Sequence, residues 1–176
     1  MNQGLHTVGA ARGKVAAQIA GASSGTAFPA TPIDGVFHRT DLEEAFVYSR
    51  TRALWMSTTR DVYEGDSPAL VASAYFFMPG GLIFTSANGY KVPYACVLTE
   101  MHVFKNDTTN DPTFQVRVGG SSVATLQAGA GNKHGASTSL NVAVASGSVL
   151  GFYCDVGLGA LLGGARIRAV LRRMAS

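Results

Sequence analysis

The sequence has little charge for a chain of 176 residues, since Asp, Glu, Lys and Arg make up only 14% of it. A soluble globular domain usually carries about 25% charged residues. So few charges indicate a surface that other chains partly cover, although small Ala and Gly residues also inflate the apolar content of 47%. The net charge is only +3, and four arginines between Arg166 and Arg173 supply more than a quarter of the positive charge. We see no broad basic face interleaved with aromatics, so we expect no nucleic-acid partner.

Cysteine is equally scarce, with Cys96 and Cys154 as the two examples. Each lies in an apolar run, where a free thiol behaves as a small hydrophobic side chain. Two cysteines make no disulfide framework, so we expect synthesis in a reducing compartment. The chain also lacks the basic head and apolar stretch of a signal peptide, and any run near the roughly 20 apolar residues of a membrane span. We therefore expect no membrane partner.

The first 35 residues differ in composition from the rest of the chain. They are rich in Gly and Ala, and their sizeable apolar side chains are too sparse to form a core. Residues 10–20 permit one short helix, and residues 21–35 are typical of an extended linker. We predict an extended N-terminal arm over residues 1–35 and a compact domain over residues 36–176. If the arm grips a neighbouring chain, the residues expected to contact it are Leu5, Val8, Val15, Ile19 and Phe28.

The rest of the chain reads as short β-prone runs separated by Gly, Asn, Asp and Pro. Thr113–Val118, Ser139–Val144 and Ala165–Arg172 alternate apolar and polar residues with period two, as half-buried strands do. Eight or more such runs at spacings of about 8–12 residues predict an all-β fold, an antiparallel β-sandwich. We favour a jelly-roll-like topology, which is common among assembly proteins. An immunoglobulin-like sandwich is the alternative, because periodicity cannot separate the two.

Two glycine-rich segments resemble catalytic motifs only in their letters. Gly21–Gly25 has the spacing of a hydrolase nucleophile elbow, but no helix pattern follows it. Gly9–Lys14 is one residue short of a phosphate-binding loop, and Val15 stands where that loop needs a hydroxyl. We therefore predict no enzyme activity and no small-molecule substrate.

Candidate metal ligands do not cluster either. The four histidines are scattered, and none has a carboxylate partner at metal-ligand spacing. Asn106–Asp111 offers oxygen atoms for calcium, but it lacks the hinge glycine and the bidentate glutamate of a calcium loop. A hairpin turn stabilised by Asx hydrogen bonds is the favoured interpretation. We predict no cofactor, and we expect Trp55, the single tryptophan, to be a buried anchor of the sandwich.

Several stretches carry a family resemblance when they are taken together: Tyr48–Ser57, Gly80-Gly81, Gly89–Pro93, Thr113–Val118, Val123–Leu126 and Leu140–Ser148. This combination resembles β-sandwich structural proteins of tailed bacteriophages, found as head decoration (cement) proteins and at tail-fibre tips. The resemblance covers about Phe46–Arg172. It implies no enzyme activity and carries over no catalytic residue.

The resemblance implies a structural protein of the virion, made in the host cytoplasm. The chain shows no heptads or repeats of a fibre shaft, so a decoration protein on the outer capsid surface is the first expectation. It would clamp neighbouring subunits of the major capsid protein and form a homotrimer, as such proteins often do. The alternative is a tail-fibre or tail-tip module that binds a receptor or glycan through Tyr63, Tyr75 and Tyr90.

Overall fold

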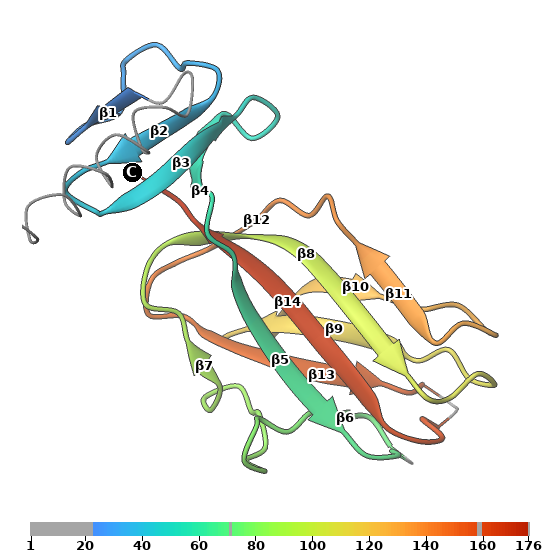
Figure 1. The fold of residues 1–176 in the computed structure, drawn as a ribbon. Coiled ribbons are helices and arrows are strands. Elements are labelled where there is room, and N and C mark those ends of the chain that lie inside the picture. The colour runs from blue at the N-terminus through green and yellow to red at the C-terminus, as the bar shows by residue number, and fades with distance from the viewer. Residues whose placement is uncertain (1–22, 71, 158–159, 176) are drawn as a thin grey trace, which may run out of the picture. The chain divides into compact units, whose positions relative to one another are not determined.

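The computed structural model describes residues 23–70, 72–157 and 160–175 (Figure 1). Within these residues every regular element is a β-strand, which confirms the all-β prediction. The chain divides into two compact units. Among the described residues, unit 1 comprises residues 23–59 and Ala175, and unit 2 comprises residues 60–174 without the gaps named above. Helices long and apolar enough to cross a membrane are absent from the described residues.

Unit 1 is a four-stranded sheet in the order β1-β2-β3-β4. β2, β3 and β4 form an antiparallel meander, whereas β1 runs parallel to β2. Glu43 and Ala53 have positive φ angles of 51° and 52°, next to the start of β3 and of β4. The strands are β1 (Ser23–Gly25), β2 (Val36–Arg39), β3 (Glu44–Ser49) and β4 (Leu54–Ser57).

Aromatic rings hold unit 1 together. Phe46 is fully buried, Phe37 and Trp55 are nearly so, and Phe28 packs against all three. Phe28 stacks on Trp55 with ring centroids 4.9 Å apart, and it meets Phe46 edge-on at 5.2 Å. Such pairs add about 0.5–1.5 kcal/mol each beyond the area that they bury. Trp55 is thus a buried anchor, but of unit 1.

The structure differs from the sequence-based assignment of residues 21–57. Residues 23–25, assigned to a linker, form β1, and the Gly25 carbonyl accepts a hydrogen bond from the Thr40 amide. The strands within 36–57, assigned to the sandwich, pair with β1 in a separate sheet. The sequence Ser-Ser-Gly carries no hydrophobic pattern that would predict a strand. β1 forms because it pairs with β2, which is a tertiary interaction. The expected helix over residues 10–20 and the loop-like Gly9–Lys14 lie outside the described residues.

Unit 2 is built from ten strands in two five-stranded sheets. One sheet has the order β11-β8-β14-β5, with β12 also pairing with β8. The other has the order β10-β9-β13-β6, with β7 also pairing with β13. The strands are β5 (Asp61–Ser67), β6 (Ala74–Tyr75), β7 (Tyr90–Lys91), β8 (Cys96–Lys105), β9 (Thr113–Val118), β10 (Ser121–Leu126), β11 (His134–Ser137), β12 (Val142–Val144), β13 (Val149–Asp155) and β14 (Ala165–Arg173).

The strand pairing of unit 2 is nested. β9 pairs with its neighbour β10, β8 with β11 and β12, β6 and β7 with β13, and the first strand β5 with the last strand β14. All of these pairs are antiparallel. A long hairpin that is folded over itself and split between two sheets gives this pattern, which is that of a jelly roll. The predicted jelly-roll-like sandwich is confirmed for unit 2.

The core of unit 2 lies between the two sheets, which Figure 1 shows one in front of the other. Ile167 and Met101 face it from one sheet, and Phe114 and Phe152 from the other, all with no exposed surface. Gly65 on β5 leaves room for two of the core rings. A Cβ atom at this position would stand 2.7 Å from Phe152 Cδ2 and 2.9 Å from Phe84 Cε2.

The period-two pattern predicts side-chain directions in β14 up to Ala169. Val170, which the alternation places outside, is buried next to a register shift in the β14–β8 pairing. Ile167, Ala169 and Leu171 of β14 are buried, and Arg166 and Arg168 point outward. The pattern over Ser139–Val144 extends further than the observed strand, since β12 covers only Val142–Val144. Likewise, the described residues of the apolar run Ala69–Met78 form only the short β6 and isolated bridges.

Candidate functional site

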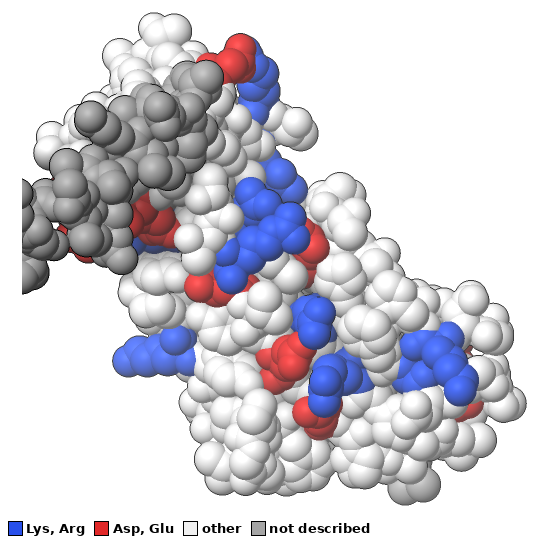
Figure 2. All heavy atoms as spheres, in the orientation of Figure 1, with Lys and Arg blue, Asp and Glu red and all other residues white. Residues whose placement is uncertain are grey.

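The outer face of the β11-β8-β14-β5 sheet carries a ladder of paired charges, which we call the charged face. Cross-strand register places Arg166 beside Asp66, and Arg168 beside Glu64. Arg166 Nε lies 2.7 Å from Asp66 Oδ1, and Arg168 Nε lies 2.6 Å from Glu64 Oε1. Figure 2 shows basic and acidic side chains alternating over the side on which Figure 1 presents β5, β14 and β8. Exposed pairs like these contribute little stability, so their main effect is to present charge.

The same face continues across β8 and β11 with imidazole and aromatic rings. Phe104 stacks on His134 with centroids 4.7 Å apart, and His102 stacks on His134 at 5.9 Å. The Glu100 carboxylate lies 3.2 Å from His102 Nε2 and 3.2 Å from Arg60 Nη1. Phe104 is 40% exposed, so an apolar surface remains open among the charges. His102 thus lies on the strand surface, as its alternation predicts.

An open hollow of about 640 Å³ lies at one end of the charged face. This volume falls within the range of about 300–1,000 Å³ that is typical of small-molecule sites. Its lining includes Ser67, Phe104, Asn106, Lys133, Arg166 and Arg168.

The outer face of the opposite sheet carries a second cluster, the tyrosine–arginine patch of Tyr75, Gln115, Arg117 and Tyr153. The Arg117 guanidinium carbon lies 3.7 Å from the Tyr153 ring centroid. Arg117 Nε donates a hydrogen bond to Gln115 Oε1 at 2.8 Å, and Nη1 donates one to the Tyr75 hydroxyl at 3.2 Å. Tyr75 meets Tyr153 edge-on at 5.1 Å. All four side chains are half-buried, so the patch is an ordered surface.

The three tyrosines expected to form a binding platform do not gather. Tyr63 and Tyr90 pack on each other at 5.1 Å and against the core, and the Tyr90 hydroxyl donates to the Glu64 carbonyl oxygen. Burial raises the pKa of both side chains. Tyr75 lies instead with Tyr153, a residue that sequence reasoning did not select. Their pairing depends on the β6–β13 register, for which the sequence gives no signal.

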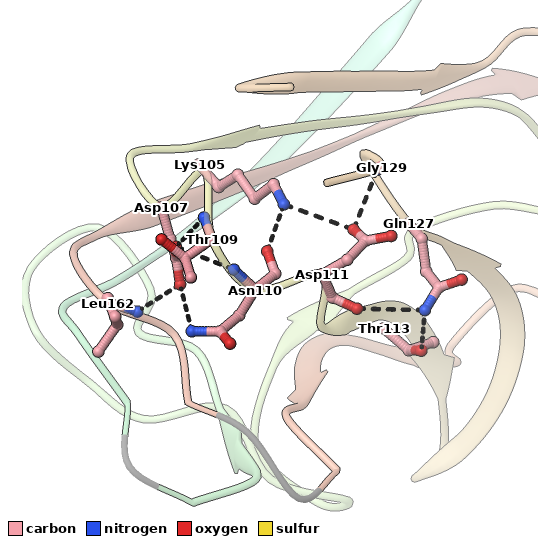
Figure 3. A network of polar contacts seen from close by, with 9 residues as sticks. All are labelled: Lys105, Asp107, Thr109, Asn110, Asp111, Thr113, Gln127, Gly129 and Leu162. Carbon is pink, nitrogen blue, oxygen red and sulfur yellow. Dashed lines mark hydrogen bonds and ion pairs between the residues drawn. The ribbon is translucent and has the colours of Figure 1, made fainter. Parts of the chain in front are cut away.

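Asn106–Asp111 forms a loop cluster with residues from two other loops (Figure 3). Asp107 accepts hydrogen bonds from the backbone amides of Thr109, Asn110 and Leu162 at 2.7, 3.1 and 2.8 Å. It also accepts one from the Asn110 side-chain amide at 3.1 Å. These donors, led by the Leu162 amide, lower the pKa of Asp107 to about 2. The carboxylate therefore fastens its own loop to the β13–β14 loop.

A lysine supplies the positive charge of this loop cluster. The Lys105 side chain is fully buried, and its Nζ donates to the Asn110 carbonyl oxygen at 2.6 Å and lies 3.4 Å from Asp111 Oδ1. Asp111 Oδ1 also accepts the Gly129 amide at 3.0 Å, which adds the β10–β11 loop. Both Asp107 carboxylate oxygens and Asp111 Oδ1 are thus engaged by N–H donors, which favours the Asx-turn interpretation over a calcium loop. No group of three or more His, Cys, Asp or Glu side chains able to hold a metal is found among the described residues.

Replacing Asp107 with asparagine is expected to lower the melting temperature of unit 2 at pH 7 by roughly 5 °C. An amide offers one oxygen where the carboxylate offers two, so buried donors lose a partner. Because the folded-state pKa is lowered from 3.8 to about 2, the ionised carboxylate stabilises unit 2 above the unfolded pKa. That stabilisation is lost as the pH falls towards about 2.

Melting curves between about pH 7 and pH 2 test this prediction, with Asp66→Asn in an exposed ion pair as the control. The Asp107→Asn variant should lose less of its remaining stability on acidification than the unsubstituted protein does. Equal acid sensitivity of the two proteins would contradict the assigned role of Asp107.

The expected partner-contact residues of the arm are described only in part. Phe28 packs in the aromatic core of unit 1. Leu5, Val8, Val15 and Ile19 lie outside the described residues.

The two thiols are structural. Cys96 and Cys154 are free and buried on the inner faces of the sandwich. Burial raises the pKa of Cys96 to about 11 and that of Cys154 to about 12. Neither thiol is therefore an activated nucleophile.

Comparison with known proteins adds no assignment, since no family model matches this chain and no curated protein or solved structure is significantly similar to it.

Proposed function

We propose that this chain is a structural protein of a tailed-bacteriophage virion, and that its jelly-roll unit binds a receptor or glycan as a tail-fibre or tail-tip module. The tyrosine–arginine patch carries this proposal. Tyr and Arg are the residues most enriched where binding energy concentrates, because they combine apolar area with hydrogen-bonding groups. The contacts of Arg117 with Gln115, Tyr75 and Tyr153 fix its side chain before a ligand arrives. Such preorganisation reduces the entropy lost on binding.

The position of Phe28 also favours this proposal over a clamping arm. An arm residue that is to contact a neighbouring subunit must be free to leave its own chain. Phe28 stacks on Trp55 and contacts Phe37 and Phe46, so moving it would open the core of unit 1. Among the described residues, the segment up to Gly35 belongs to a folded unit.

A capsid decoration protein is the second candidate, and the low charge content favours it. A chain with 14% charged residues would suit a surface that the major capsid protein and neighbouring copies cover. Many copies on one shell would bind strongly even with modest contacts per copy. We propose a homotrimer under both functions, which analytical ultracentrifugation can test.

Substituting the patch should weaken ligand binding without unfolding the protein. We expect Arg117→Ala and Tyr153→Ala to weaken binding to host cells, and to any glycan found on an array, by roughly tenfold or more. Arg60→Ala is the matched control, because Arg60 is an exposed arginine that pairs with Glu100 on the other sheet. Unchanged binding by both patch variants would contradict the assignment of the patch.

The copy number and position of the chain in purified particles separate the two candidates. A few copies at the tail tip are expected for a receptor-binding module. Hundreds of copies on the head would overturn that function and establish decoration. Absence from every particle would exclude both.

A further inference from the structure

The hollow on the charged face has an uneven balance of charge. Four basic side chains line it, those of Lys105, Lys133, Arg166 and Arg168, against one acidic side chain, that of Asp66. The Lys105 ammonium is directed to Asn110 and Asp111. Lys133 is exposed and has no ion pair within the described part of the chain. Arg166 and Arg168 are paired with Asp66 and Glu64, so within the described residues Lys133 carries the positive charge of the hollow that no carboxylate neutralises.

The two arginines are held so that their ends stay available. Each is hydrogen-bonded through Nε, Arg166 to Asp66 and Arg168 to Glu64, and the Arg168 guanidinium carbon also lies 5.9 Å from the Phe104 ring centroid. Among the described residues, the Nη groups of these two side chains donate to no acceptor. Two terminal N–H groups in a fixed plane match the two oxygens of a carboxylate or phosphate.

Neutral groups complete the lining. Ser67 and Asn106 bring hydrogen-bonding side chains, and Phe104 brings an apolar surface that His134 supports from one side. A cavity of about 640 Å³ is larger than a bare inorganic anion needs. Apolar surface, hydrogen-bonding groups and cations together suit a sugar ring that bears an acidic group.

We propose that this hollow is a binding site for an acidic saccharide, whose carboxylate or phosphate group is held by Lys133 and the Nη groups of Arg166 and Arg168. The site is on the sheet opposite the tyrosine–arginine patch. It does not depend on whether the chain belongs to the tail or to the head.

Calorimetric titration of the full chain at low salt tests the proposal with two charged probes and their neutral counterparts. The probes are digalacturonate beside a neutral galactose disaccharide, and glucose 6-phosphate beside glucose. We expect at least one acidic sugar to bind at least tenfold more tightly than its neutral counterpart, and the binding to weaken as salt is raised. Comparing the two acidic probes identifies which anionic group the site prefers.

Lys133→Ala and Arg166→Ala should each weaken binding of the acidic sugar at least fivefold, and both positions are exposed enough for the fold to survive. Lys91→Ala, at an exposed lysine on β7, should leave it unchanged. The proposal is overturned if neither acidic sugar binds, if neutral sugars or inorganic phosphate bind equally well, or if binding is lost in Arg117→Ala and kept in Lys133→Ala.

Discussion

Replacing Gly65 with alanine is expected to lower the free energy of unfolding of unit 2 by about 2–3 kcal/mol, as overpacking of a dense core does. The new methyl group would lie 2.7 Å from Phe152 and 2.9 Å from Phe84. Both rings are fully buried and meet edge-on at 5.2 Å, so neither can turn aside without displacing the other. Either β5 moves away from β14 or the rings leave their packed positions.

Urea unfolding followed by far-UV circular dichroism measures this loss, and Gly151→Ala on β13 is the matched control. A Cβ atom at Gly151 would meet its nearest neighbours at 3.6–3.7 Å, an ordinary contact distance. We expect the Gly151 variant to stay within about 1 kcal/mol of the unsubstituted protein. If both variants lose the same stability, the cost lies in glycine replacement in general and the proposed packing constraint is wrong.

Replacing Phe46 with alanine is expected to unfold unit 1 and leave unit 2 folded. Removing a fully buried phenylalanine costs about 3–5 kcal/mol. Small folded units have little stability to lose, since they bury a smaller fraction of their surface than large domains do. Phe46 also contacts Phe28 directly, so its loss takes away one side of the aromatic cluster.

The single tryptophan makes this outcome simple to observe. Trp55 belongs to unit 1, so its fluorescence should shift to longer wavelength in the variant, while the circular dichroism of unit 2 persists. Phe104→Ala makes the same chemical change at a 40% exposed position and should leave the tryptophan signal unaltered. A single cooperative transition for both units in the Phe46 variant would refute the prediction.

The sequence predicts the strands of unit 2 because their signal is local. In β9 the period-two pattern survives, and in β14 it holds from Ala165 to Ala169, since each strand has one face in the core and one outside. The same pattern cannot show where one sheet ends and another begins. Phe46 and Trp55 look like sandwich residues, but their strands pair in a separate sheet and their rings pack with Phe28 in a separate core.

The candidate sites were harder to predict because both depend on cross-strand register. Arg117 meets Tyr153 and Tyr75 from three different strands, and Arg166 and Arg168 meet acidic residues about 100 positions away. The loop cluster is easier to predict from the sequence, because the Asx residues of Asn106–Asp111 interact within a few positions of each other. Its Lys105 was missed, since a lysine at the end of an apolar strand suggests an exposed side chain.

The nested pairing of unit 2 also constrains the order of events during synthesis. β5 leaves the ribosome first among the strands of this unit, yet its sheet neighbour β14 is translated last. The inner pair β9–β10 can close at once, whereas β5 must remain without its partner until nearly the whole unit has been made. Long-range pairing of this kind folds on a scale of milliseconds to seconds. During translation, β5 is therefore an open strand edge on which nascent copies of the chain can associate wrongly, and a chaperone that covers it would raise the yield of folded protein.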